Sequence, residues 1–241
     1  MALGSVIRRT RKTAKLQSTM TSSDVARNSD ATIYVVDDDP GARASVTALA
    51  ESHGVAVRSF PSAEAFLEYI GQVEEPRGCV VADVRMKGMS GLELQQHAKI
   101  DLPIIIITAY ADIPMAVQAI QNGAVDFLTK PCEPERLWTT ITRALTQDRA
   151  ARHAHRDEEV LRGRLAALTG AERAVLEKVM HGLPNKQIAR DLDIGLRTVE
   201  LRRSNIMKKM KADSLAELIQ LALAAGFKTD GPHVATDKPE N

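Results

Sequence analysis

The sequence predicts two folded domains: an α/β domain on a doubly wound, parallel five-stranded sheet, then a charged helical linker and an all-α domain of four helices. Between residues 32 and 146, short apolar runs alternate with amphipathic stretches, as in a chain of strand–helix units. From residue 168, apolar residues recur at helical spacing only. Residues 31–140 carry 8 Lys+Arg and 15 Asp+Glu, a net charge of −7, whereas residues 161–228 carry 13 and 7, a net charge of +6. The two blocks are therefore expected to have different partners.

The strands and helices of the first block follow in order. Five short apolar runs are predicted as strands: Thr32–Val36, Ala56–Phe60, Cys79–Ala82, Ile104–Thr108 and Asp126–Thr129. Amphipathic helices are predicted after them: Pro40–Ser52, Ala63–Ile70, Ser90–Lys99, Pro114–Gln121 and Glu133–Thr146. The fourth run (IIIIT) is β-branched throughout, which indicates a strand buried on both faces. Continuous apolar strands separated by helices predict a parallel sheet, and such sheets place their sites at the carboxyl ends of the strands.

The second block is helical throughout. Four helices are predicted: Thr169–His181, Asn185–Leu192, Leu196–Met210 and Ser214–Ala225. Thr169, with Glu172 three residues later, has the pattern of a capping box. The predicted domains are therefore a disordered basic leader, the α/β domain, a helical linker, the all-α domain and a disordered tail: residues 1–30, 31–146, 147–166, 167–227 and 228–241.

The composition excludes several classes of protein. Two cysteines without CxxC spacing do not form a disulfide scaffold or a zinc site, and they favour a reducing, cytosolic compartment. Cys79 and Cys132 are expected at opposite ends of the sheet, too far apart to pair. No run approaches about 18 apolar residues, so we expect no membrane association. The first 20 residues lack the apolar core of a secretory signal. They are an unfolded basic leader, a transit-like segment, or a start codon placed too early, with Met20 as the true start.

Polar side chains follow four of the predicted strands where each strand ends: Asp37, Asp38 and Asp39, then Asp83, Thr108 and Lys130. In a doubly wound sheet these positions converge on one edge. Three carboxylates in one place repel one another, and oxygen ligands select a hard ion, Mg²⁺ before zinc or copper. A carboxylate beside Mg²⁺, an ammonium and a hydroxyl can attack a phosphoryl group. Each feature alone is common in a solvated loop or a turn, but their joint placement favours a phosphoryl-transfer site.

The stretches VVDDDP, VVADVRMKGMSGLEL, IIIITAYAD and AVDFLTKP occur in the order typical of one family. Residues 31–146 resemble the receiver domain of bacterial two-component response regulators. The resemblance implies that Asp83 accepts the phosphoryl group and that Mg²⁺ is held by Asp37, Asp38, Asp83 and the backbone carbonyl of Arg85. It further implies that Lys130 contacts the phosphoryl oxygens.

The same resemblance assigns Thr108 as the switch hydroxyl and Phe127 as the aromatic switch residue, although ordinary core packing also accounts for Phe127. It implies a cis peptide bond between Lys130 and Pro131. Lys87 departs from the family, which usually has Pro at this position. The lysine adds a cation near the site and loosens the loop without removing a ligand.

Residues 185–210 (NKQIARDLDIGLRTVELRRSNIMKKM) have the pattern of a helix–turn–helix. Val199, Ile206 and Met210 lie on one apolar face of the second helix. Its opposite face is polar and basic, which fits the major groove of DNA. An ordinary helical bundle with a solvated basic face is the alternative.

Residues 168–210 closely resemble the LuxR-type four-helix DNA-binding domain, and together with the receiver they match the FixJ-like class of transcription regulators. By position, three residues would face base edges: Glu200, Leu201 and Ser204. Five others would contact phosphates: Lys186, Arg197, Arg203, Asn205 and Lys208. Two residues depart from the family: Gly195 stands where it prefers a Ser helix cap, and Arg202 replaces a common His.

These observations predict a phosphorylation-controlled transcription factor and not an enzyme. The expected partners are a sensor histidine kinase, double-stranded promoter DNA, RNA polymerase and, after phosphorylation, a second copy of the chain that pairs through its fourth helix, fifth strand and fifth helix. One alternative is a Mg²⁺-dependent aspartyl-phosphate phosphohydrolase, but that chemistry needs a second Asp where Arg85 stands. A constitutive DNA-binding protein is the other alternative, and the complete set of site residues argues against it.

Overall fold

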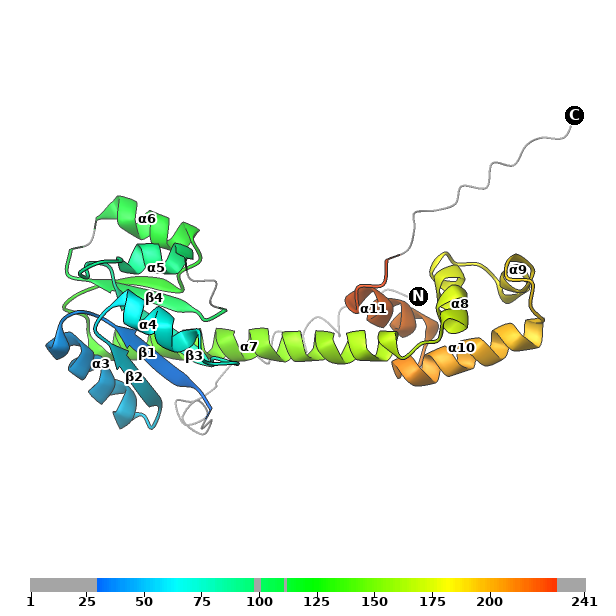
Figure 1. Cartoon of the computed structure of the whole chain (residues 1–241), viewed down its shortest axis with the longest axis horizontal. Helices are drawn as coiled ribbons and strands as arrows, with labels where there is room; N and C mark the ends of the chain where they lie inside the picture. The colour runs from blue at the N-terminus through cyan, green and yellow to red at the C-terminus, as the bar shows by residue number, and fades with distance from the viewer. Residues whose placement is uncertain (1–29, 98–100, 111, 229–241) are drawn as a thin grey trace, which may run out of the picture. The chain divides into compact units, whose positions relative to one another are not determined.

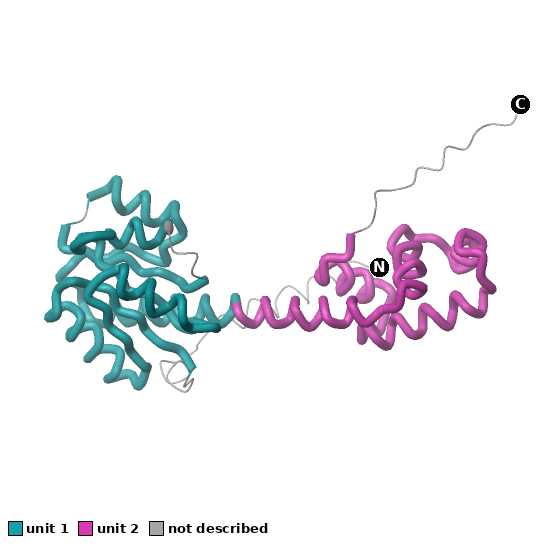
Figure 2. Tube along the Cα trace, in the orientation of Figure 1, with its two compact units in different colours: residues 1–151 teal, residues 152–241 magenta. Residues whose placement is uncertain are grey.

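The computed structural model describes residues 30–97, 101–110 and 112–228, which form two compact units, residues 1–151 and 152–241 (Figure 2). Most of the predicted leader and of the predicted tail lies outside the described residues, as does the end of the helix predicted over Ser90–Lys99. Each unit has its own apolar core. Among the described residues, no helix is both long and apolar enough to cross a membrane.

The first unit contains a parallel five-stranded sheet in the order β2-β1-β3-β4-β5. Its strands are β1 (Thr32–Val36), β2 (Ala56–Phe60), β3 (Gly78–Asp83), β4 (Ile104–Thr108) and β5 (Asp126–Thr129). Four of the five have the predicted bounds, and β3 is one residue longer at each end. Every residue of β3 and β4 is buried, which confirms the expectation that the isoleucine strand lies inside the sheet.

Helices cover both faces of this sheet (Figure 1). They are α3 (Pro40–Ser52), α4 (Ala63–Ile70), α5 (Gly91–His97), α6 (Ile113–Gln121) and α7 (Pro134–Ala166). Alternate strand residues point to opposite faces. Ile33 and Val35 of β1 thus pack in the core beneath α3 and α7, whereas Tyr34 and Val36 pack in the core beneath α4, α5 and α6. The doubly wound α/β prediction is confirmed.

The structure confirms that the stretch predicted as a helical linker, 147–166, is helical, and it joins this stretch to the helix predicted over 133–146. The structure has one continuous helix, α7, because no Pro interrupts the stretch after its first residue. Asp148 lies beyond the predicted helix end and is nevertheless buried, with 2% exposure, and its carboxylate accepts a 3.0 Å hydrogen bond from the Gly78 N–H of β3. Further along, Glu158 and Arg162 form an ion pair one turn apart.

The second unit holds α8 (Gly170–Met180), α9 (Asn185–Asp191), α10 (Leu196–Met210) and α11 (Leu215–Ala224). The predicted capping box is present, since Thr169 and Glu172 exchange side-chain to backbone hydrogen bonds. The Glu172 carboxylate also accepts a 2.7 Å bond from Lys209, which lowers the pKa of Glu172. Val175, Leu176 and Ile206 form the core with Leu165 from the last turn of α7.

Both cysteines are free, as expected. Cys79 is fully buried, and burial raises the pKa of its thiol well above the usual value. It therefore behaves as a small apolar core residue.

Candidate phosphoryl-transfer site and nucleic-acid interface

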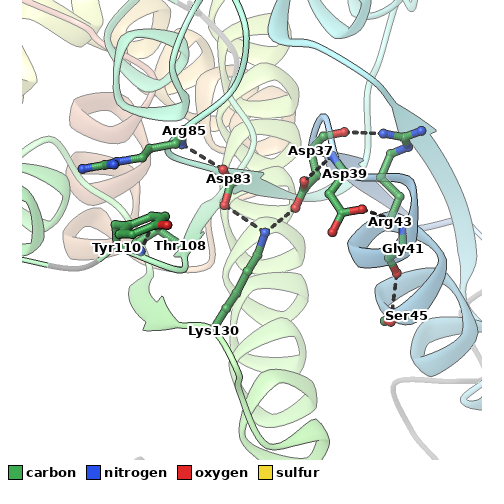
Figure 3. A network of polar contacts seen from close by, with 10 residues as sticks. All are labelled: Asp37, Asp39, Gly41, Arg43, Ser45, Asp83, Arg85, Thr108, Tyr110 and Lys130. Carbon is green, nitrogen blue, oxygen red and sulfur yellow. Dashed lines mark hydrogen bonds and ion pairs between the residues drawn. The ribbon is translucent and has the colours of Figure 1, made fainter.

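The sheet brings the predicted acidic residues together at the carboxyl ends of β1 and β3 (Figure 3). One carboxylate oxygen from each of Asp37, Asp38 and Asp83 lies within 4.8 Å of the others. Asp37 and Asp83 are buried, with 4% and 6% exposure, and Asp38 is exposed. Three carboxylates, one of them at the surface, are a donor set that fits a hard divalent cation such as Mg²⁺.

Lys130, which follows β5, donates hydrogen bonds to two of these carboxylates. Its Nζ lies 2.5 Å from Asp37 Oδ2 and 2.9 Å from Asp83 Oδ1. Burial opposes the charged ammonium, but the bonds to Asp37 and Asp83 outweigh it and raise the pKa of Lys130. The lysine therefore stays protonated beside Asp83. The bond between Lys130 and Pro131 is cis, as the resemblance implied.

Neighbouring groups and burial act on the pKa of the Asp83 carboxyl in opposite directions. Burial is the largest influence, and together with the neighbouring Asp37 it raises the pKa of Asp83 although Lys130 acts in the other direction. Its second oxygen, Oδ2, accepts a 2.8 Å hydrogen bond from the Arg85 N–H. A desolvated carboxylate is a better nucleophile than one surrounded by water, since less hydration is lost when it reacts.

Asp37 and Asp39 organise the turn from β1 into α3. Asp37 Oδ1 accepts from the Asp39 N–H at 2.9 Å, and the Arg43 guanidinium donates to the Asp37 carbonyl at 2.6 Å. Asp39 caps α3 by accepting from the Gly41 N–H at 2.9 Å.

Thr108 ends β4 and is fully buried. Its Oγ1 accepts a 3.2 Å bond from the Tyr110 N–H, and the Tyr110 ring lies 4.4 Å from the Arg85 guanidinium carbon. Tyr110 is 64% exposed, so the Arg85–Tyr110 pair forms the solvent side of the region around Asp83 (Figure 3). Phe127 of β5 is half-buried and packs against the core beneath α4, α5 and α6.

In the second unit, α9, a short turn and α10 form the predicted helix–turn–helix. Val199, Ile206 and Met210 are buried, as the periodicity required. The opposite face of α10 is exposed and carries Arg197, Glu200, Leu201, Ser204 and Lys208. Leu201 is 62% exposed on this face.

Three of the predicted phosphate-contact residues do not belong to the exposed face of α10. The Arg203 guanidinium donates to Asn185 Oδ1 and so joins α10 to the first residue of α9. Asn205 is half-buried, whereas Lys186 is exposed on α9. Gly195 begins α10 without a side-chain cap, as its lack of a side chain requires.

Comparison with known proteins agrees with both halves of this geometry. Residues 33–142 match the response regulator receiver domain, and residues 166–222 match the LuxR family of bacterial regulatory proteins. The transcriptional regulatory protein FixJ of Bradyrhizobium diazoefficiens is 44% identical over 201 residues, covering 82% of this chain and 97% of its own. FixJ of Rhizobium meliloti is 46% identical over 201 residues, covering 82% and 98%. The chain is a response regulator of the FixJ type.

Solved structures of response regulators have the same architecture. That of StyR is 41% identical with a TM-score of 0.72, covering 81% of this chain and 99% of its own. Full-length FixJ from B. japonicum is 42% identical with a TM-score of 0.51, covering 84% and 100%. As in its relatives, this regulator joins a receiver to a DNA-binding domain.

Two features of the regulator's receiver were not found by sequence reasoning. Arg85 and Tyr110 were not recognised as a stacked pair, because they belong to different loops 25 residues apart. Glu64 was not connected with the site at all, yet its carboxylate accepts a hydrogen bond from the loop that follows Asp83. No local pattern marks either contact, since both depend on how the loops meet at the sheet edge.

Proposed function

We propose that Asp83 accepts a phosphoryl group from a sensor histidine kinase, and that the phosphorylated chain dimerises and binds promoter DNA. The observation that carries this proposal is the position of Lys130, bonded to both Asp37 and Asp83. A cation held at the acceptor carboxylate neutralises the charge of an incoming phosphoryl group.

In the proposed reaction, a carboxylate oxygen of Asp83 forms the new O–P bond while the N–P bond of the kinase's phosphohistidine breaks. The histidine nitrogen keeps the electron pair of that bond. Lys130 stabilises the negative charge on the phosphoryl oxygens, and the Thr108 hydroxyl turns to meet the phosphate. Mg²⁺, held by Asp37, Asp38, Asp83 and the Arg85 carbonyl, would neutralise part of that charge.

The proposed dimer face consists of α6, β5 and the first turns of α7. Support comes from three apolar residues of α6 that are exposed: Ile113, Val117 and Ile120, at 80%, 48% and 50%. An exposed apolar group of this kind on a receiver is typical of a surface that meets another protein. Movement of Thr108 and Phe127 on phosphorylation would reshape this face from within the sheet.

In the proposed DNA complex, α10 enters the major groove with Glu200, Leu201 and Ser204 at the base edges. The proposed phosphate contacts are Lys186, Arg197, Arg203, Asn205 and Lys208. A dimer doubles these contacts and raises the effective concentration of one domain at the second half-site. RNA polymerase in the bacterial cytoplasm is the proposed downstream partner.

The proposed domain bounds are 31–146 for the receiver, 147–166 for the linker and 167–227 for the DNA-binding domain. The family matches over 33–142 and 166–222 support them. The proposed bounds of the leader and the tail are 1–30 and 228–241.

The test is uptake of phosphate from acetyl phosphate with and without Mg²⁺, followed by sedimentation and DNA titration at one stated salt concentration. Wild type should take up phosphate only with Mg²⁺, then dimerise and bind DNA more tightly. Asp83→Asn should remain an unphosphorylated monomer that binds weakly. If Asp83→Asn dimerises and binds like treated wild type, the phosphorylation switch is wrong and a constitutive DNA-binding role replaces it.

A further inference from the structure

The loop that joins β3 to α5, residues 84–90, starts directly after the acceptor aspartate. Its two ends are closed by a 3.2 Å hydrogen bond from the Gly91 N–H to the Val84 carbonyl. A Cβ at Gly91 would lie 2.2 Å from the Asp83 carbonyl oxygen, so only glycine permits this approach. Near its start, the loop donates the Arg85 N–H to Asp83 Oδ2. The path of this loop therefore decides where the Arg85 backbone lies beside the acceptor.

The far side of the loop is bound by a residue from another helix. The Met89 N–H donates a 2.8 Å hydrogen bond to Glu64 Oε1, across 25 residues of sequence. Gly88 has a φ of +84°, and a Cβ there would lie 2.6 Å from the same carboxylate oxygen. The carboxylate thus lies directly against the backbone of Gly88 and Met89. The Met89 N–H is also the largest cause of a lowered pKa at Glu64.

Glu64 is held firmly although its side chain is exposed. It lies in the first turn of α4, which begins at the cap residue Ser62. Ala63, Phe66 and Ile70 of the same helix are buried against the sheet. The backbone of Glu64 is therefore fixed relative to β3, whereas the loop contains Gly88, whose backbone is little restricted.

We propose that Glu64 is a positioning residue for the phosphoryl-transfer site: by holding Met89 it keeps the 84–90 loop, and with it the Arg85 backbone, in place beside Asp83. Its effect on Mg²⁺ and phosphate chemistry rests on the function proposed above. The contact itself does not, because it is made between α4 and the loop alone.

The experiment uses the full chain as wild type, Glu64→Ala, Glu64→Gln and the control Glu68→Ala. Glu68 is exposed on the same helix one turn later. Hydrogen exchange of the Met89 amide is followed by NMR in metal-free protein. Mg²⁺ affinity is measured by calorimetry, and phosphate uptake from acetyl phosphate is measured as a function of Mg²⁺ concentration.

Glu64→Ala should speed exchange at Met89 and raise the Mg²⁺ dissociation constant roughly tenfold, the lower end of the effect of outer partners of metal ligands. The uptake rate at saturating Mg²⁺ should stay close to that of wild type. Glu64→Gln keeps an acceptor oxygen, so its Met89 exchange rate and its Mg²⁺ dissociation constant should lie between those of wild type and Glu64→Ala. It replaces Glu64→Ala in the experiment if that variant does not fold. Glu68→Ala should match wild type in every measurement.

Unchanged exchange at Met89 together with unchanged Mg²⁺ affinity in Glu64→Ala would overturn the proposal. An equal loss of Mg²⁺ affinity in Glu68→Ala would also overturn it, because the effect would then come from a general disturbance of α4 and not from the contact of Glu64 with Met89. A third outcome separates the two hypotheses. If Met89 exchanges faster in Glu64→Ala but wild type neither binds Mg²⁺ nor takes up phosphate, Glu64 does hold the loop and the proposed function is wrong.

Discussion

Replacing Asp148 with alanine should destabilise the receiver although the residue lies on the stretch predicted as a linker. The Asp148 carboxylate is buried and accepts a 3.0 Å bond from the buried Gly78 N–H. A Cβ built at Gly78 would lie 1.8 Å from the Thr32 carbonyl oxygen, so the backbone of this glycine packs directly against β1. A buried N–H left without an acceptor costs about 1–3 kcal/mol. We therefore expect the free energy of unfolding to fall by about 2 kcal/mol, a roughly thirtyfold change in the folding equilibrium.

Urea unfolding followed by the fluorescence of Trp138 measures this loss directly. Trp138 is the one tryptophan of the chain and is buried in the receiver core, so its emission reports on that unit. The midpoint should fall while the slope with urea stays the same. Asp148→Asn keeps an acceptor oxygen and should lose less. Asp157→Ala, at an exposed position of the same helix, is the control.

The reasoning is refuted if Asp148→Ala unfolds within about 0.5 kcal/mol of Asp157→Ala, the range of ordinary surface substitutions. It is also refuted if Asp148→Asn loses as much as Asp148→Ala. In that case the amide of Gly78 would not be the group that the carboxylate serves.

Three further predictions concern the two functional surfaces. Shortening both Arg85 and Tyr110 to alanine removes the stacked pair at the solvent side of Asp83 and should speed loss of phosphate severalfold, as measured by the decay of labelled phosphoprotein; unchanged or slower decay contradicts it. Burial raises the pKa of Asp83, so ionising this carboxyl lowers the free energy of unfolding. The loss is absent below the unfolded pKa and grows as pH rises through the folded pKa. Asp83→Asn should therefore gain stability over wild type between about pH 3 and neutrality in metal-free buffer, and a difference independent of pH would speak against this. Leu201→Ala should relax the sequence preference by about 1 kcal/mol at one base pair, with little change in the salt dependence of binding. Arg203→Ala should instead lower the melting temperature of the DNA-binding domain, because Arg203 bonds to Asn185. If the two variants have equal effects in DNA titration and in melting, this prediction is wrong.

Much of this architecture could be predicted because its signals are local. The run TIYVV and the isoleucine strand are apolar segments bounded by polar residues, so their limits agree with the structure. The convergence of Asp37, Asp83 and Lys130 followed from the general rule for parallel sheets. The capping box at Thr169 is likewise a pattern of four adjacent residues.

The remaining features depend on contacts that no local pattern encodes. The contact of Asp148 with Gly78 joins residues 70 apart, and no apolar periodicity in the charged stretch of α7 marks Asp148 as buried. Arg203 has the composition expected of a phosphate contact, yet its bond to Asn185 depends on how α9 meets α10. The role of Arg203 at DNA therefore stays a prediction.

The ammonium of Lys130 between Asp37 and Asp83 has a consequence for how the receiver folds. Three carboxylates and one ammonium have a formal charge of −2 instead of −3, and the two buried carboxylates are the ones that the ammonium contacts. The chain therefore supplies its own counter-ion at the sheet edge. Small zinc domains, by contrast, gain their folding energy from the metal. We therefore expect the receiver to fold in a chelating buffer, without the proposed Mg²⁺.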